Sequence, residues 1–271
     1  MVTFYARLKA LKTEGFVPKI PMRIDAGNFL IKTVESAEEL ETVLQLRWQI
    51  FHREFRKDAA SQAPGPEGGL DIDEYDFLCD HLVIIEKDTD RLVGTYRLIS
   101  SSFSDRFYSS GEFVIDRLMA MPGTKLELGR ACIDRSFRSG MVITLLWRGL
   151  AAYIREVKAD YLFGCSSAKT MDPAEVAAIQ AYLRDRGYVT DEYGVEPQPA
   201  FRMPAPAPGS PAVDPAVAEK LVPSLLGSYL KAGAKVCGEP ALDRDFECTD
   251  FFTVLRTESL TRMFERKYQV C

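Results

Sequence analysis

The chain has 271 residues, enough for one large domain or two small ones with a packed core. Hydrophobic residues make up 46% of it and charged residues 27%, which argues against a disordered protein. The formal net charge of -5 is not the basic excess that nucleic-acid-binding proteins carry, so we expect no nucleic-acid partner.

The six cysteines and two histidines form no recognisable metal-binding pattern. The cysteines have no CxxC spacing, whereas zinc ligands come in close pairs. We therefore expect no metal, and reduced thiols in a cytoplasmic protein. The N-terminus lacks a signal-peptide stretch, and no apolar run reaches the roughly 18 residues that cross a bilayer.

The first residues are compatible with a helix in which apolar and basic side chains alternate. Tyr5, Leu8 and Leu11 are separated by arginine and lysine. Such a helix either lies on the inner face of the cytoplasmic membrane or packs as an ordinary surface helix, and we favour the second alternative. Residues 1–28 are treated as an N-terminal extension, and residues 29–271 as one domain.

In the first half of the chain the pattern predicts a helix over residues 36–55, a loop over 61–69, a hairpin over 80–100 and a strand over 125–134. In the second half it predicts a helix over 141–157, a strand over 159–167, a helix over 172–188 and a Pro-rich crossing segment near 196–215. A helix that begins at residue 215 and ends at Gly233 or Gly238, and a last strand over 246–256, follow. Hairpin strands that lead into a strand–helix–strand unit indicate an α/β protein with a mixed sheet flanked by helices.

Charged residues stand at positions where the pattern otherwise predicts buried side chains. Glu127 and Arg130 interrupt the apolar strand over 125–134, and a bulge near Gly129 would be needed for their side chains to meet. Bulges also expose backbone N–H groups that can hold a carbonyl. A structural ion pair and a functional pair remain equally open for these two residues.

An acidic segment precedes the hairpin. Its charged residues are Asp71, Asp73, Asp76 and Asp80, which crowd around Tyr75 and His81. The segment is either a solvated acidic loop or a pocket that attracts a cation such as a substrate ammonium. Asp80 could orient a neutral imidazole at His81, although a histidine at the start of a strand is more often structural.

Two arginines require partners because they lie on apolar faces. Arg47 is on the apolar face of the first helix and Arg97 is in the second hairpin strand, and a buried guanidinium needs carboxylates. One buried network would explain all these charges together. Its predicted members are Arg47, Asp73, Asp76, Arg97, Glu127 and Arg130.

These motifs resemble two related enzyme families. The order Arg47…Phe51, "DIDEYD", "GTYRLI" and "ELGR" resembles the acyl-homoserine lactone synthases, a branch of the GCN5-related N-acyltransferase (GNAT) fold. A closer resemblance is to the OlsB-type ornithine N-alpha-acyltransferases of ornithine lipid synthesis. It rests on "YDFLCDHLVI", "ELGRACIDRSFRSG", "LLWRGLAAYI", "LFGCSS" and "LLGSYLKAGAKVCGEPALDRDF", and runs from about Phe29 almost to the C-terminus.

The closer resemblance implies a GNAT-like fold with a largely antiparallel, twisted central sheet. It also implies an enzyme that moves a 3-hydroxy fatty acyl group from acyl carrier protein to the alpha-amine of ornithine. The donor would be acyl-phosphopantetheine on the carrier, with no permanently bound cofactor. Lysine, glycine or glutamine as acceptor, a lactone-type signal synthase and a non-enzymatic carrier-docking module are the alternatives.

The resemblance also implies roles for individual residues. Substrate binding is expected at Arg47, Phe51, Asp73, Asp76 and Arg97. Catalysis is expected at Glu127 and Arg130, with Asp80 or His81 as alternative proton acceptors.

The donor's phosphate is expected at the loop formed by Arg135, Arg138, Ser139 and Gly140. This loop has one glycine where acetyl-CoA-dependent relatives have two, which weakly favours a carrier with a single phosphate. Lys125, Arg148 and Arg155 could extend a basic patch for an acidic carrier. The sequence does not indicate an oligomeric state.

Overall fold

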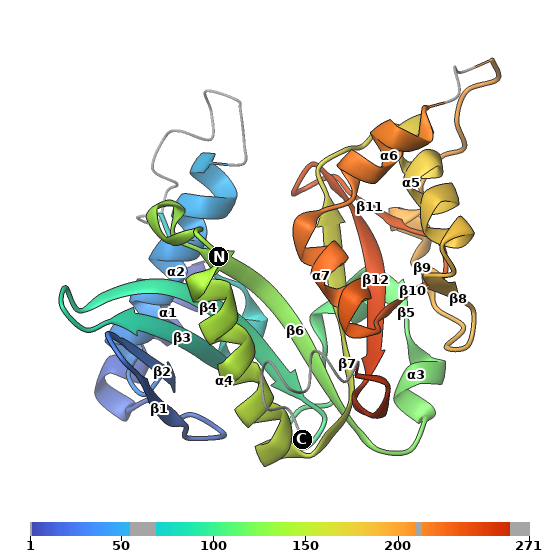
Figure 1. Ribbon diagram of the computed structural model, residues 1–271. Helices are drawn as coiled ribbons and strands as arrows, with labels where there is room; N and C mark the ends of the chain where they lie inside the picture. Colours follow the sequence, from blue (N-terminus) through green and yellow to red (C-terminus); the bar gives the residue numbers. More distant parts are fainter. Residues whose placement is uncertain (1, 55–68, 210–212, 261–271) are drawn as a thin grey trace. The chain divides into compact units, whose positions relative to one another are not determined.

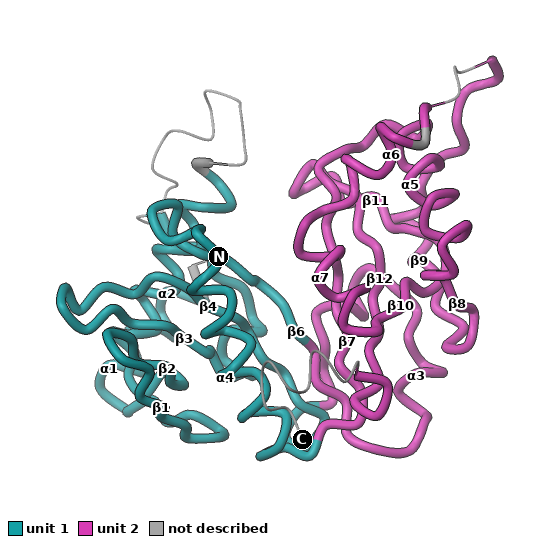
Figure 2. Tube along the Cα trace, viewed as in Figure 1, with its two compact units in different colours: residues 1–104, 128–158, 266–271 teal, residues 105–127, 159–265 magenta. Residues whose placement is uncertain are grey.

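The computed structural model describes residues 2–54, 69–209 and 213–260, so all but the last residue of the loop predicted at 61–69 lies outside the described residues. The chain divides into two compact units (Figure 2). Unit 1 comprises residues 1–104, 128–158 and 266–271, and unit 2 comprises residues 105–127 and 159–265. Strand β6 (Thr124–Ile133) contributes its first residues to unit 2 and the rest to unit 1.

The sheet of unit 1 has the strand order β1 (Arg23–Ala26), β2 (Phe29–Thr33), β3 (Asp80–Glu86), β4 (Arg91–Ser100) and β6. Strands β1 to β4 pair antiparallel, and β3–β4 confirms the predicted hairpin. The β1–β2 hairpin, which turns at Gly27 with a φ of 62°, was not predicted from the sequence.

Helices cover both faces of this sheet (Figure 1): α1 (Val2–Glu14), α2 (Ala37–Trp48) and α4 (Met141–Val157). Val83 of β3 packs with Leu40 and Leu44 of α2. Leu82, the residue before Val83, lies against Gly149 of α4. A Cβ added to Gly149 would be 2.9 Å from the Leu82 side chain. Because successive side chains of a strand point to opposite faces, α2 and α4 lie on opposite sides of the sheet.

Helix α1 packs its apolar residues inward. Leu8 is buried in the same cluster as Val34 and Leu40, and Leu11 packs against that cluster. This favours an ordinary surface helix over a helix lying on a membrane, because Leu8 is turned toward the protein. Among the described residues, no helix is both long and apolar enough to cross a bilayer.

The sheet of unit 2 has the order β6, β7 (Ala159–Ala168), β12 (Cys248–Arg256), β10 (Lys235–Cys237) and β8 (Val189–Thr190), with β11 (Ala241–Asp243) paired to β12. Strands β6–β7 and β8–β10 are parallel, whereas β12 is antiparallel to β7, β10 and β11. Strands β5 (Phe113–Val114) and β9 (Glu196–Pro197) pair separately. The mixed sheet expected from the sequence is therefore confirmed.

The helices of unit 2 are α3 (Asp116–Ala120), α5 (Pro173–Asp185), α6 (Pro215–Leu221) and α7 (Ser224–Ala232). Helices α5 and α7 pack on β12 through Ile179, Leu226 and Phe251. The ring of Phe252, the next residue along β12, lies 5.3 Å from that of Phe113 and belongs to the opposite face. Short 3₁₀ helices lie at Glu74–Phe77, Tyr108–Gly111, Arg135–Phe137, Pro199–Phe201 and Thr257–Ser259, and a π-helical turn at Gln49–Glu54 follows α2.

The single helix predicted from residue 215 to Gly233 or Gly238 is wrong in its continuity, because two helices with a break between them occupy this range. Val222 is extended and Pro223 precedes α7, as expected since a proline disfavours helical backbone in the residue before it. Helix α7 then ends at Gly233, whose φ of 110° suits glycine, and β10 follows.

Candidate active site

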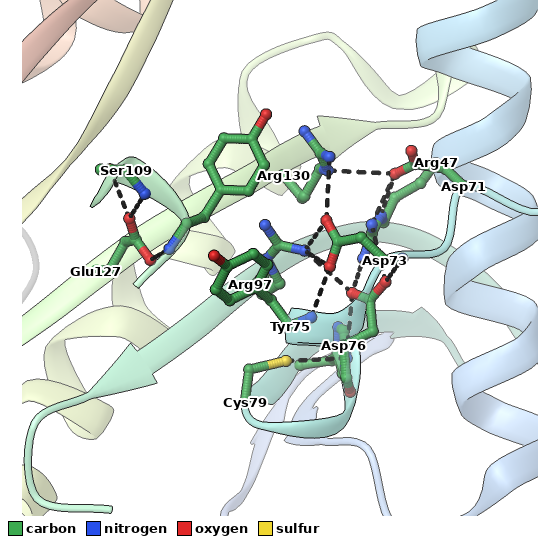
Figure 3. A network of polar contacts seen from close by, with 12 residues as sticks. Arg47, Asp71, Asp73, Tyr75, Asp76, Cys79, Arg97, Ser109, Glu127 and Arg130 are labelled. Carbon is green, nitrogen blue, oxygen red and sulfur yellow. Dashed lines mark hydrogen bonds and ion pairs between the residues drawn. The ribbon is translucent and has the colours of Figure 1, made fainter. Parts of the chain in front are cut away.

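Arg47 is buried at the end of α2 and is held by two carboxylates. Its Nε donates to Asp71 Oδ2 at 2.7 Å, and its Nη1 donates to Asp76 Oδ1 at 2.5 Å (Figure 3). The helix that positions it starts at the N-cap Ser36, whose side chain accepts a hydrogen bond from the Glu39 N–H. Leu40, Val43 and Leu44 share the buried face, as the spacing predicted.

Arg97 and Arg130 complete this network from two neighbouring strands. Arg97 Nη1 lies 2.7 Å from both carboxylate oxygens of Asp73, and 3.3 Å from Asp76 Oδ1. Arg130 Nη2 donates to Asp73 Oδ2 at 3.2 Å, and Arg130 Nε lies 3.4 Å from Asp71 Oδ2. Arg130 itself has a left-handed φ of 50°, and the bulge predicted near Gly129 stays a prediction.

The acidic loop is rigid because its carboxylates also bind its own backbone. Asp73 Oδ1 accepts from the Tyr75 N–H at 2.9 Å, and Asp76 Oδ2 accepts from the Asp73 N–H at 2.8 Å. This reciprocal capping starts the 3₁₀ helix Glu74–Phe77. The loop therefore holds its three aspartates in fixed positions for the three arginines.

Burial alone would raise the pKa of Asp71 and Asp73, but the arginines outweigh it. Arg47 and Arg130 hold the pKa of Asp71 well below its usual value, and the pKa of Asp73 falls to about 2 beside Arg97, Arg130 and Arg47. Three arginines thus neutralise three aspartates. The role of this loop in attracting a substrate ammonium stays a prediction, and all three of its aspartates are paired with arginines.

Asp80 and His81 are both buried and point to opposite faces of β3. The Asp80 carboxylate accepts hydrogen bonds from the N–H groups of Lys19 and Ile20 at 2.7 and 2.8 Å, and from the Tyr153 hydroxyl at 2.7 Å. Asp80 thereby anchors the segment before β1.

His81 is oriented by other groups than Asp80, so the predicted pairing of these two residues is not formed. Its Nε2 lies 3.2 Å from Cys79 Sγ and 3.3 Å from the Asp76 carbonyl oxygen. Burial lowers the pKa of His81 to about 4, so its imidazole is neutral at physiological pH. Phe51 lies in the π-helical turn after α2 and packs against Leu46 and Ile50.

Glu127 is held by a separate set of donors within unit 2. Its side chain is buried, with 3% of the residue exposed. The carboxylate accepts from the Tyr108 N–H at 2.8 Å, and from the N–H and hydroxyl of Ser109 at 2.7 and 2.5 Å (Figure 3). Within unit 1, direct contacts join five of the six residues expected in one network, and within unit 2 Glu127 is held by Tyr108 and Ser109.

A second group of acidic and thiol side chains near Glu127 was missed by sequence reasoning. Cys165 Sγ lies 3.5 Å from Ser109 Oγ and 3.6 Å from Glu112 Oε2. Burial, with Asp250 beside it, raises the pKa of Glu112 to about 9. Asp250 stands inside the apolar run "CTDFFTVL", the same signal that singled out Arg97 and Glu127.

The loop before α4 carries the predicted donor-binding residues on its surface. Arg135, Arg138, Ser139 and Gly140 are all exposed, and Gly140 has a φ of 97° at the N-cap of α4. Arg138 Nε donates to the Ile133 carbonyl at 2.9 Å, which fixes the base of its side chain.

The basic patch expected near this loop is smaller than predicted. Arg148 and Arg155 are exposed on α4, as expected. Lys125 is buried and donates to the carbonyls of Met121 and Gly123, so the proposal that it contributes to a docking patch is wrong.

Comparison with known proteins identifies the family. Residues 46–148 match the model of the acetyltransferase (GNAT) domain. The L-ornithine N(alpha)-acyltransferase of Rhizobium meliloti (strain 1021) is 33% identical over 242 residues, which cover 84% of this chain and 80% of that protein. The enzyme of the same name from Brucella abortus (strain 2308) is 29% identical over 254 residues, 89% of each chain.

Among solved structures, the acyl-homoserine lactone synthase BjaI is 16% identical with a TM-score of 0.48, and the match covers 86% of this chain and 83% of that one. At that score the likeness carries no weight, and the family assignment rests on the sequence relatives. The GNAT-like fold and the closer of the two resemblances are confirmed. The chain belongs to the family of L-ornithine N(alpha)-acyltransferases.

Proposed function

We propose that this protein transfers a 3-hydroxy fatty acyl group from acyl carrier protein to the α-amine of ornithine. The observation that carries the proposal is the 33% identity to an L-ornithine N(alpha)-acyltransferase over 84% of this chain and 80% of that protein. The buried charged clusters support an active enzyme over a docking module, because a module that only binds needs no such clusters.

Glu127 is proposed to take a proton from the reacting amine. An ornithine α-ammonium must lose one proton before its nitrogen can attack a thioester, and a second once the C–N bond forms. A carboxylate held by three donors, two from Ser109 and one from Tyr108, can serve as the acceptor directly or through a water molecule. Asp80 is the alternative acceptor, because its carboxylate is held by a similar set of donors, two N–H groups and a tyrosine hydroxyl.

Within unit 1, Arg130 is proposed as the arginine that binds a substrate carboxylate. Its side chain is 14% exposed, whereas those of Arg47 and Arg97 are 1% and 2% exposed. A guanidinium suits carboxylate recognition, because it presents paired donors. Arg47 and Arg97 then support the site by fixing Asp71 and Asp73, the two aspartates that pair with Arg130. Phe51 packs against Leu46 and Ile50 in the same unit.

The donor is proposed to dock on the loop before α4. Exposed Arg135 and Arg138 supply positive charge, and the N–H groups that follow Gly140 can bind the single phosphate of phosphopantetheine. Met141, which is 56% exposed at the start of α4, offers an apolar contact beside them. This combination suits an acidic carrier protein better than it suits free CoA.

A product assay tests the proposal. The purified protein is mixed with a 3-hydroxyacyl carrier protein or the matching CoA thioester, and in separate reactions with ornithine, lysine, glycine or glutamine. Mass spectrometry of the lipids should show Nα-acylornithine, formed much faster from the carrier-bound donor. Another acyl amino acid would contradict the acceptor, equal rates from CoA would contradict the donor, and no product with any amine would contradict the reaction.

A further inference from the structure

Ser109 supplies two hydrogen bonds to the Glu127 carboxylate. Its backbone N–H and its hydroxyl both reach Oε1, at 2.7 and 2.5 Å (Figure 3). Ser109 is itself completely buried in the 3₁₀ helix Tyr108–Gly111. A carboxylate bound at once by a main-chain and a side-chain donor of one rigid residue keeps a single orientation.

The Ser109 hydroxyl is in turn oriented by the thiol of Cys165. Cys165 Sγ on β7 lies 3.5 Å from Ser109 Oγ, and burial raises the pKa of this thiol well above its usual value, so it remains an S–H donor. Because the hydroxyl oxygen accepts from the thiol, its own hydrogen is directed at Glu127. Glu112 Oε2 lies 3.6 Å from the same sulfur, and burial and Asp250 on β12 raise the pKa of Glu112 to about 9, so it is also protonated at neutral pH.

We propose that Ser109 is a positioning residue for the acyl transfer, which acts by fixing the Glu127 carboxylate and stabilising its ionised form, with Cys165 directing the serine hydroxyl. The proposal rests on the proposed function of Glu127. Ser109 does not touch the substrate in this account. Ser109 affects the reaction through the orientation and basicity of the Glu127 carboxylate.

The protons released in the reaction explain why the hydrogen bond from Ser109 to Glu127 affects the rate. The amine nitrogen attacks the thioester carbonyl carbon, the C–N bond forms, and the C–S bond breaks with its electron pair on sulfur. Two protons leave the nitrogen of an ornithine ammonium, and the departing thiolate takes one of them. The other must pass to a base that is ionised at the working pH, and the Ser109 hydroxyl favours that form of Glu127.

The test compares Ser109→Ala with Ser110→Ala, a matched control from the same 3₁₀ helix. The Ser110 hydroxyl also makes a short hydrogen bond, at 2.6 Å, but to the Phe107 carbonyl instead of Glu127. The readout is the pH profile of kcat/KM for ornithine at saturating acyl donor, together with the thermal unfolding midpoint. Ser109→Thr, which keeps a hydroxyl, is the rescue variant.

We expect Ser109→Ala to lower kcat/KM about tenfold, and to move the acidic limb of its profile up by about one pH unit. Ser110→Ala should keep the wild-type profile, and Ser109→Thr should recover most of the loss. Should Ser109→Ala not fold, Ser109→Cys makes the same comparison, because a thiol is a poor donor of similar size.

A Ser109→Ala enzyme with reduced stability but an unshifted profile would overturn the proposal and leave Ser109 a structural residue. Glu127→Gln in the same assay separates this failure from that of the proposed function. If Glu127→Gln is as active as the wild type, the proposed role of Glu127 fails, and the inference about Ser109 fails with it. If Glu127→Gln is inactive and Ser109→Ala is unchanged, the inference about Ser109 alone is wrong.

Discussion

The Arg47 guanidinium lies 2.5 Å from the Asp76 carboxylate, Nη1 to Oδ1, and both side chains are completely buried. Neither charge can be solvated by water at that position, so each depends on the other and on the rest of the network. Breaking a buried pair is much more costly than breaking a surface pair, because the remaining charge stays in a medium of low polarity.

Asp76→Asn should therefore destabilise the protein by about 3–5 kcal/mol, because Arg47 and Arg97 each lose a charged partner. The control is Arg184→Ala, which removes the pair of Arg184 with Glu239, whose side chains are 51% and 62% exposed. This change should cost at most about 1 kcal/mol. Urea denaturation measures both variants, and equal losses would contradict the view that the Asp76 network is solvent-shielded.

The raised pKa of Glu112 predicts a specific dependence of stability on pH. Burial and Asp250 move this pKa from 4.5 to about 9 in the folded protein, so the folded state holds a proton that the unfolded state releases above pH 4.5. The stability that the protonated form provides is present below pH 4.5 and is lost as the pH rises toward 9.

Glu112→Gln, which cannot ionise, should remove this loss. Its free energy of unfolding should fall less than that of the wild type between pH 6 and 9, by on the order of a few kcal/mol. Urea denaturation at several pH values gives the slope of the free energy of unfolding against pH for the wild type and for Glu112→Gln. Parallel slopes would mean that Glu112 is already ionised in the folded protein at neutral pH.

Gly149 lets α4 approach the sheet of unit 1 closely. A Cβ at this position would lie 2.7 Å from Ile31 and 2.9 Å from Leu82, closer than real contacts allow. Gly149→Ala should thus destabilise the protein by about 1–3 kcal/mol, although alanine is the better helix former.

Gly227 in α7 is the control, because nothing lies within 4 Å of an added Cβ there. Gly227→Ala should stabilise the protein by up to about 1 kcal/mol. The thermal unfolding midpoints of the two variants should therefore move in opposite directions. A shift of the same sign in both would show that α4 can move away from the sheet at little cost.

Arg138 is the arginine in the loop before α4 that we expect to matter most for the donor. Arg138→Glu should raise the KM for acyl carrier protein about tenfold, with little effect on stability, because it reverses an exposed charge. Arg155→Glu is the matched control, because Arg155 is exposed near the far end of α4, about 20 Å along the helix from Met141. An equal effect of both substitutions would show that the carrier responds to net charge and does not dock at this loop.

The sequence predicts long, periodic elements well and short or non-local ones poorly. Helix α4 has the predicted bounds, because its apolar face is continuous and Gly140 stands directly before it. The β1–β2 hairpin was missed because β1, "RIDA", is short and carries two charges. The break between α6 and α7 is encoded by Pro223, but the apolar pattern on both sides of it hides the break.

Some contacts of the candidate site could likewise be predicted from the sequence, and others could not. Arg47, Arg97 and the aspartates could be predicted to meet, because buried charges require partners of opposite sign. Ser109 and Cys165 could not, because nothing in a single sequence indicates that a small polar residue of a loop lies against a particular strand. The left-handed φ of Arg130 is likewise set by the folded structure.

The most direct test of the account is one competition assay. Wild type and Glu127→Gln are each given 3-hydroxyacyl carrier protein with equal amounts of ornithine and lysine, and the acylated products are quantified by mass spectrometry. We expect the wild type to form mainly Nα-acylornithine, and folded Glu127→Gln to form it roughly a hundredfold more slowly. Equal rates from the two proteins, or a wild-type product made mainly from lysine, would contradict the account.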